Sequence, residues 1–123
     1  MRLDHLHLMV SDVQSTAAFL ETWFGMTRLV GGRDKFVVMR DESWLVLTLM
    51  QGRDHQYPKH FHIGFNLAEA ADVNALWERM RADGLQPSTP EAAHAWSFYV
   101  AAPGGFNVEV LAPVPETEAA KAE

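Results

Sequence analysis

Hydrophobic and polar positions alternate along two stretches of the chain that share one pattern. Residues 59–67 place an apolar side chain at every second position and His62 on the other side. Residues 2–10 alternate in the same way, with His5 and His7 on the polar side. Because successive side chains of a strand face opposite sides, each stretch predicts a strand with one apolar face and one histidine-bearing face.

A helical pattern follows each of these strands. Apolar residues recur at helical spacing in residues 11–24 and 69–82. Gly25 and Gly84 come next, and glycine suits the left-handed position that ends a helix. Ser11 is the expected N-cap of the first helix, with a weak capping box. The second half of the chain therefore resembles a repeat of the first.

Turn residues separate the remaining β-rich stretches. Further strands are expected at residues 27–30, 35–39, 44–50, 96–101 and 106–111, with turns at 31–34, 40–43 and 103–105. Each half thus begins with a strand and a helix and ends in strands. The predicted organisation is one domain over residues 1–115, with modules at about 2–50 and 59–112, followed by a flexible tail at 116–123.

Composition narrows the classes of function. The chain has 123 residues, which fits one domain, and no cysteine, which excludes disulfides, thiolate nucleophiles and zinc–thiolate sites. The net charge of −6 without a basic cluster argues against a nucleic-acid partner. The sequence has no apolar run long enough to predict a membrane span. The first strand is not preceded by the charged and then apolar segment that is typical of a secretory signal. We expect a cytoplasmic protein with no membrane partner.

Glu109 interrupts an otherwise apolar part of the last strand, between two valines. A buried carboxylate must be paired or bound to a metal ion. His5 and His62 stand in register across the repeat, so the three side chains can converge if the halves pair about a pseudo-twofold axis. Two imidazoles and one carboxylate leave open positions, which favours Fe²⁺ or Mn²⁺ over Zn²⁺ or Ni²⁺. Taken singly, a strand histidine such as His5 or His62 is more often an exposed or otherwise satisfied side chain than a metal ligand, and Glu109 alone is compatible with an edge-strand glutamate that faces solvent.

Several ordered motifs resemble the vicinal oxygen chelate superfamily. They are Leu3-x-His5-Leu6-x-Leu8-x-Val10-Ser11-Asp12, His62-Ile63-Gly64-Phe65, Ser97-Phe98-Tyr99 and Pro103-x-Gly105-x-x-Val108-Glu109. This group of proteins includes glyoxalase I, extradiol ring-cleaving dioxygenases, fosfomycin-resistance thiol transferases, methylmalonyl-CoA epimerases and bleomycin-binding proteins. The resemblance implies an α+β fold of two βαβββ modules that form a curled mixed sheet around a metal pocket. By the same resemblance, His5, His62 and Glu109 match the family's metal positions.

The resemblance also implies a function. It indicates a metal-dependent small-molecule enzyme whose ion chelates two adjacent oxygens of the substrate. Tyr99 is the expected catalytic hydrogen-bond donor or acid. His7, His94 and Trp96 are the expected substrate contacts. A homodimer is expected, because family members commonly pair and the sheet edges need cover.

Departures from family patterns bear on the subclass. Glyoxalase I adds a ligating glutamate on the last strand of its first module, and the matching position here is Val46. Residues 112–120 contain no basic residue of the kind that fosfomycin enzymes use around the phosphonate. The stretch from His94 to Glu109 resembles the end of the extradiol dioxygenase signature, which favours dioxygenase-like chemistry. The alternatives are a glyoxalase-like lyase and a metal-free drug-binding or resistance dimer.

Overall fold

The structure, a computed structural model, describes residues 1–53 and 56–116. The chain divides into two compact units. The first contains Met1–Lys59 together with Ala102–Phe106, and the second contains His60–Ala101 and the chain from Asn107 onward. Most of the tail expected at 116–123 lies outside the described residues. Among the helices of the described part, none is long and apolar enough to cross a membrane.

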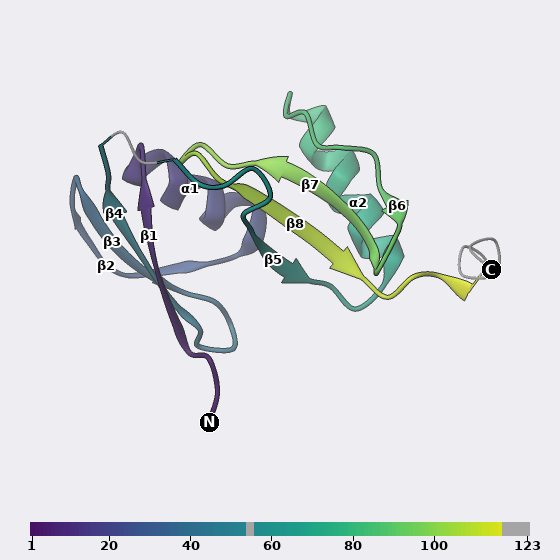
Figure 1. Cartoon of the computed structure of the whole chain (residues 1–123), viewed down its shortest axis with the longest axis horizontal. Helices are drawn as coiled ribbons and strands as arrows, with labels where there is room; N and C mark the ends of the chain where they lie inside the picture. Colours follow the sequence, from purple (N-terminus) through teal and green to yellow (C-terminus); the bar gives the residue numbers. More distant parts are fainter. Residues whose placement is uncertain (54–55, 117–123) are drawn as a thin grey trace. The chain divides into compact units, whose positions relative to one another are not determined.

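The first unit is a four-stranded mixed sheet with one helix (Figure 1). Its elements are β1 (His5–Val10), α1 (Val13–Phe24), β2 (Thr27–Arg33), β3 (Phe36–Arg40) and β4 (Val46–Gln51). The strand order is β1-β4-β3-β2, in which β1 and β4 are parallel and the other neighbours are antiparallel. Helix α1 packs on β3 and β4. The first half is therefore a βαβββ module.

One face of this sheet forms the apolar core of the first unit. The register aligns Leu8 with Leu49 and Leu49 with Val37, and all three side chains are buried. Val13, Ala17 and Leu20 of α1 are also buried. The alternation in β1 therefore turns His5 and His7 to the opposite face, as the sequence predicts.

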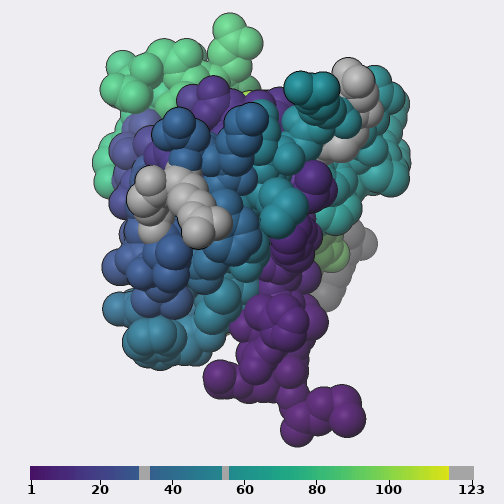
Figure 2. Space-filling model, turned by 90° about the vertical axis from the view of Figure 1, so that its left-hand side faces the viewer, coloured from purple at the N-terminus to yellow at the C-terminus, as the bar shows by residue number. Residues whose placement is uncertain are grey.

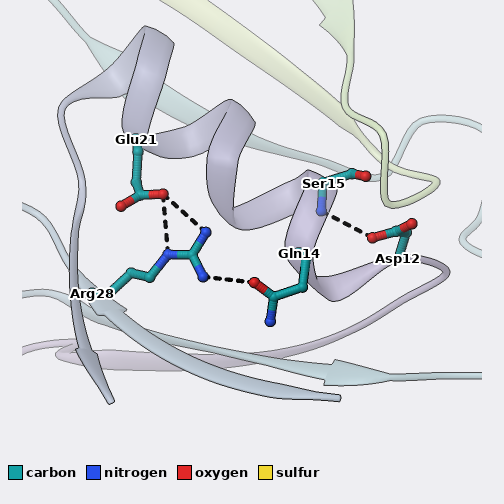
Figure 3. A network of polar contacts seen from close by, with 5 residues as sticks. All are labelled: Asp12, Gln14, Ser15, Glu21 and Arg28. Carbon is teal, nitrogen blue, oxygen red and sulfur yellow. Dashed lines mark hydrogen bonds and ion pairs between the residues drawn. The ribbon is translucent and has the colours of Figure 1, made fainter. Parts of the chain in front are cut away.

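The N-terminus of α1 is capped by Asp12 and not by Ser11. The Asp12 carboxylate accepts a hydrogen bond from the Ser15 backbone N–H at 2.9 Å (Figure 3). The expected capping box is also wrong, because the Ser11 backbone N–H, which the Gln14 side chain would have to bind, donates to the Gly104 carbonyl at 3.1 Å. The Gln14 side chain accepts a hydrogen bond from Arg28 at 2.8 Å (Figure 3). The Ser11 hydroxyl does not cap the helix and instead donates a hydrogen bond to the carbonyl of Pro103 at 3.3 Å.

The connection between β2 and β3 is shorter than predicted. The expected turn at 31–34 is replaced by a continuing strand that ends at Arg33, and the turn occupies Asp34 and Lys35. The β2–β3 pairing shows register shifts on either side of Val30. Such irregularities absorb extra residues in one strand without ending the pairing. Gly31 and Gly32 therefore lie within β2 and do not end it.

The first strand begins later in the chain than the alternation predicts. Strand β1 begins at His5 and not at residue 2. Met1 and Leu3 are exposed, and the N-terminal segment stands out at the base of the view in Figure 2. Asp4 makes the first pairing contact, since its carbonyl accepts from the Val46 N–H at 2.9 Å. Residues before Asp4 therefore lack the burial that would hold a strand.

The turn after Ala101 packs tightly against the end of β1. The Ser11 backbone N–H donates to the Gly104 carbonyl at 3.1 Å. A Cβ atom on Gly104 would lie 2.5 Å from the Thr16 hydroxyl oxygen and 2.8 Å from Val10 Cβ. Both neighbours are fully buried, so neither can move away easily. Glycine is required here by space.

Gly104→Ala is expected to lower the free energy of unfolding by about 1–3 kcal/mol, the usual cost of overpacking. Chemical denaturation measures this change. Gly64→Ala is the matched control, because its new Cβ would meet only the Leu111 side chain at 3.4 Å and the Glu109 carbonyl at 3.7 Å. A Gly104→Ala protein as stable as wild type would contradict the packing described for this turn.

The second unit repeats the first. Its elements are β5 (His62–Asn66), α2 (Ala70–Ala82), β6 (Glu91–Ala92), β7 (Trp96–Ala101) and β8 (Asn107–Ala112). The strand order β5-β8-β7-β6 has β5 and β8 parallel and the other neighbours antiparallel. Strand β5 is shorter than the expected 59–67, and β6 is a short strand that the sequence did not predict.

Helix α2 covers one face of this second sheet (Figure 1). Its Val73, Leu76 and Met80 are buried, as are Phe98 and Val110, which are register partners on β7 and β8. The α+β fold of two βαβββ modules is therefore confirmed, with a separate four-stranded sheet in each module.

Candidate functional site

The register of the second sheet places Glu109 between Gly64 and Tyr99. Gly64 on β5 pairs with Glu109 on β8, and Glu109 pairs with Tyr99 on β7. Residues directly opposite in a sheet share a face. Tyr99 therefore lies on the same face as Glu109, the face opposite to that of the buried Phe98 and Val110.

Glu109 is a buried carboxylate. Only 3% of its surface is exposed, and its Oε2 atom has no hydrogen-bond partner within the described residues. Removing an ionised carboxylate from water is costly unless a cation or donors compensate. An ionised Glu109 therefore needs a positive charge beside it, either a protonated imidazole or a metal ion.

Two imidazoles flank this carboxylate. His62 Nε2 lies 3.4 Å from Glu109 Oε1, and His94 Nε2 lies 3.2 Å from Oε2. The His94 side chain is 64% exposed, so it approaches Glu109 from the solvent side. His94, which the sequence suggested as a substrate contact, is thus brought to the same carboxylate as the predicted ligand His62.

The hydrogen bonding of His62 determines which nitrogen faces Glu109 with a lone pair. Its Nδ1 lies 2.9 Å from the carbonyl oxygen of His60. Since a carbonyl oxygen only accepts, Nδ1 must carry the proton. The neutral ring then presents the Nε2 lone pair to Glu109 Oε1. Two electron-pair donors facing each other in this way need a proton or a metal ion between them.

The separation of these two donors fits a shared ion. Ligands bound at about 2.0–2.2 Å to one metal ion lie roughly 3–3.5 Å apart at octahedral or tetrahedral angles. The 3.4 Å between His62 Nε2 and Glu109 Oε1 falls in that range. The donor set of neutral imidazole and carboxylate suits divalent iron or manganese. These two residues therefore fit the implied metal.

His5 is prepared in the same way in the first unit. Its Nδ1 lies 2.7 Å from the Asp4 carboxylate. This hydrogen bond to His5 lowers the pKa of Asp4. A carboxylate on Nδ1 is the usual arrangement behind a metal-binding histidine, because it fixes the ring and leaves Nε2 free. The sequence signal for this contact is the aspartate directly before His5, a position that the resemblance motif leaves unspecified.

The predicted ligands are divided between the units. His5 belongs to the first, and His62 and Glu109 belong to the second. Within residues 1–53 and 56–116, no group of three or more His, Asp or Glu side chains is arranged to hold a metal ion by itself. The three-ligand site therefore stays a prediction.

Tyr99 lies against His62, with ring centroids 5.3 Å apart and nearly perpendicular planes. Partial burial raises the pKa of the Tyr99 hydroxyl, and the neighbouring Glu109 carboxylate raises it further. A phenol with a raised pKa keeps its proton at neutral pH and remains a donor. The backbone of Tyr99 is held on both sides by Ser88.

The two other expected substrate contacts are Trp96 in the second unit and His7 in the first. Trp96 donates its indole N–H to Asn74 of α2 at 2.9 Å, and so points to the helix-covered face and away from Glu109. His7 pairs with Thr48 in the first sheet and is exposed on the same face as His5. The structure thus brings together His62, His94, Tyr99 and Glu109, and leaves Trp96 on the other face.

The register also corrects the comparison made at Val46. Val46 pairs with His5. Two positions further along the strands, Thr48 pairs with His7. In the second module the residue two positions after His62 pairs with Glu109. The counterpart of Glu109 in the first module is therefore Thr48. Neither Val46 nor Thr48 supplies a carboxylate.

Known structures share this fold. A Bacillus cereus structure described as a possible glyoxalase is 42% identical, with a TM-score of 0.86 over 90% of this chain and 98% of that chain. A mutant of the fosfomycin resistance protein FosX from Listeria monocytogenes, solved with Mn(II) and 1S,2S-dihydroxypropylphosphonic acid, has a TM-score of 0.77 at 22% identity, covering 98% of this chain and 97% of its own.

Sequence comparison gives the same result. The glutathione transferase FosA of Serratia marcescens is 26% identical over 111 residues, which are 88% of this chain and 78% of FosA. The model of the Glyoxalase/Bleomycin resistance protein/Dioxygenase superfamily matches residues 2–110. With the two βαβββ modules already established, this match shows that the chain belongs to the Glyoxalase/Bleomycin resistance protein/Dioxygenase superfamily, the vicinal oxygen chelate proteins.

Proposed function

We propose that this protein is a metal-dependent enzyme that acts on a small molecule with two adjacent oxygen atoms. His5, His62 and Glu109 hold the ion, and Fe²⁺ or Mn²⁺ suits this donor set best. When bound, the ion supplies Lewis-acid chemistry to the substrate oxygens. The observation that carries the proposal is the buried Glu109 carboxylate facing the Nε2 lone pair of His62 at 3.4 Å.

The relatives support the choice of metal and of ligand class. FosX from Listeria monocytogenes was solved with Mn(II) together with a dihydroxypropylphosphonic acid, whose two hydroxyl groups are on adjacent carbons. Similar chemistry in this chain would need a neutral imidazole and a carboxylate in contact, which His62 and Glu109 provide.

The other side chains of the face have separate roles in this proposal. Tyr99 donates a proton or a hydrogen bond to a bound oxygen, since its hydroxyl stays protonated at neutral pH. Gly64, directly opposite Glu109, has no side chain and so leaves that position of the face open. His94, on the solvent side of Glu109, lies where it can contact a substrate that approaches the carboxylate.

The subclass is proposed at a coarser level. The motif from His94 to Glu109 favours ring-cleaving dioxygenase-like chemistry, whereas the similar proteins are described as a glutathione transferase, a fosfomycin resistance protein and a possible glyoxalase. A glyoxalase-like lyase has less support, because it would need a glutamate as fourth metal ligand in the first module, and that position is Thr48 here. Chelation of adjacent oxygens does not depend on this choice.

A metal-free binding protein is the second candidate. The contacts of His62 and His94 with Glu109 would also neutralise the carboxylate if an imidazole were protonated. Such a protein would bind or sequester a small molecule, with the histidines as polar groups of the site. Either candidate fits a homodimer located in the cytoplasm, which remains the expected state.

Titration of untagged protein with Mn(II) by calorimetry distinguishes the two candidates. We expect one ion per chain in the wild type, and at least about 100-fold weaker binding in His5→Ala and His62→Ala, because loss of a direct ligand exceeds the roughly 10–100-fold effect of an outer-shell change. His60→Ala is the control, since the backbone carbonyl that orients His62 remains. A His5→Ala protein that binds Mn(II) like wild type would contradict the ligand assignment.

A further inference from the structure

An exposed tryptophan in a strained backbone conformation marks the β3–β4 connection of the first unit. Trp44 has φ of +66°, and it is the only residue other than glycine with positive φ in the described part of the chain. Bulky residues rarely adopt this region, and the strain costs about 1–3 kcal/mol. Trp44 is also 54% exposed, so burial of its ring does not explain the strain. A strained exposed residue of this kind indicates a functional position.

Asp41 maintains this conformation. Its carboxylate accepts hydrogen bonds from the backbone N–H groups of Ser43 and Leu45, both at 2.9 Å, and its carbonyl accepts from the Trp44 N–H at 3.2 Å. Although partial burial by itself raises the pKa of Asp41, these hydrogen bonds hold it below its usual range. The Asp41 carboxylate is thus committed to the turn.

Arg40 stacks on this tryptophan and keeps its charge available. The guanidinium carbon lies 4.3 Å from the centroid of the Trp44 ring, and Nη1 donates to the Asp41 carbonyl at 3.1 Å. Across residues 1–53 and 56–116, no carboxylate forms an ion pair with Arg40, in contrast to Arg28, which pairs with Glu21 at 3.0 Å. The Arg40 charge does help to lower the pKa of the neighbouring Asp41 carboxylate, but that carboxylate accepts its hydrogen bonds from backbone N–H groups of the turn. A guanidinium fixed on an aromatic ring and not bonded to a carboxylate is suited to an external oxyanion.

The sheet places this pair on the same face as His5. Arg40 pairs with Val46, and Val46 pairs with His5. Residues in register across neighbouring strands share a face, and strands lie about 4.8 Å apart. The Cα atoms of Arg40 and His5 are therefore about 10 Å apart. An extended small molecule near His5 can reach Arg40.

We propose that Arg40 and Trp44 form an anion-binding subsite that takes a carboxylate of the substrate. The substrate class is then an acid in which a flat or apolar spacer, lying on Trp44, separates the carboxylate from the two adjacent oxygens. This inference rests on the proposed function. The net charge of −6 makes the local cation more selective, because the rest of the surface repels anions.

Two probes that differ only in the distal group test the subsite. Dihydrocaffeate is a catechol with a propionate chain, and its primary amide has the same shape without the charge. We expect the Mn(II)-loaded wild type to bind the acid at least about tenfold more tightly than the amide by calorimetry, about 1.4 kcal/mol. The preference should shrink as salt is raised, because it depends on charge.

Arg40→Met should abolish the preference while leaving affinity for the amide and for Mn(II) unchanged. Arg81→Met is the matched control, because Arg81 forms the same kind of pair with Trp77 on α2, 4.8 Å from the ring centroid. Trp44→Leu should weaken binding of both probes. Equal binding of acid and amide by wild type would overturn the subsite and leave chelation standing, whereas binding of neither probe would overturn both.

Discussion

Glu109→Gln is expected to remove most of the bound metal and to leave the folded protein intact. The carboxylate is 3% exposed and faces the lone pair of His62, so its amide analogue keeps the shape but loses the anionic ligand. Mn(II) affinity should fall by at least about 100-fold. The metal-free variant should be at least as stable as metal-free wild type, because it no longer buries a charge.

Thermal unfolding with and without Mn(II) separates these two effects. Ligand at a hundredfold excess over its Kd stabilises a protein by about 2.7 kcal/mol, and only the wild type should gain this. Glu91→Gln is the control, because Glu91 is an exposed carboxylate of the same sheet. Metal binding that survives in Glu109→Gln would remove Glu109 from the ligand set.

Tyr99→Phe is expected to lower turnover by roughly 10²- to 10⁴-fold, the usual contribution of a positioned proton donor. Metal affinity and stability should change little, because the ring remains in place against His62. The loss should appear mainly in kcat, since the hydroxyl acts on the reacting oxygens. Steady-state kinetics with the first substrate identified measures this.

The other tyrosine provides the matched control for that variant. Tyr57 donates its hydroxyl to the carbonyl of Met9 at 2.7 Å in the first unit. Tyr57→Phe should therefore cost about 1 kcal/mol of stability for one lost hydrogen bond and leave turnover unchanged. Equal turnover in Tyr99→Phe and wild type would return Tyr99 to a packing role.

Side-chain alternation made the faces of the strands predictable. His5, His62 and Glu109 lie on the sides of their strands opposite to the neighbouring apolar residues, so their faces could be assigned before any pairing was known. The repeat likewise predicted a strand, a helix and further strands in each half. These features are local, because each depends only on residues close in sequence.

Features that depend on distant residues were not predictable. Whether Tyr99 shares a face with Glu109 depends on the register of β7 and β8, and the counterpart of Glu109 could be identified as Thr48 only from β1–β4 pairing. The approach of His94 to Glu109 depends on a loop. The choice of Asp12 over Ser11 as N-cap was not predictable, because the two are neighbours, both have side chains that can cap a helix, and the choice depends on which residue begins the helix.

The most direct test of the central claim is a crystal structure of the Mn(II)-loaded protein with anomalous diffraction at the manganese edge. We expect one anomalous peak per site, bonded to Nε2 of His5, Nε2 of His62 and the carboxylate of Glu109. Bond lengths should be about 2.0–2.3 Å, as for small divalent ions with nitrogen and oxygen ligands. A peak bound without Glu109, or no peak near His62 at saturating Mn(II), would contradict it.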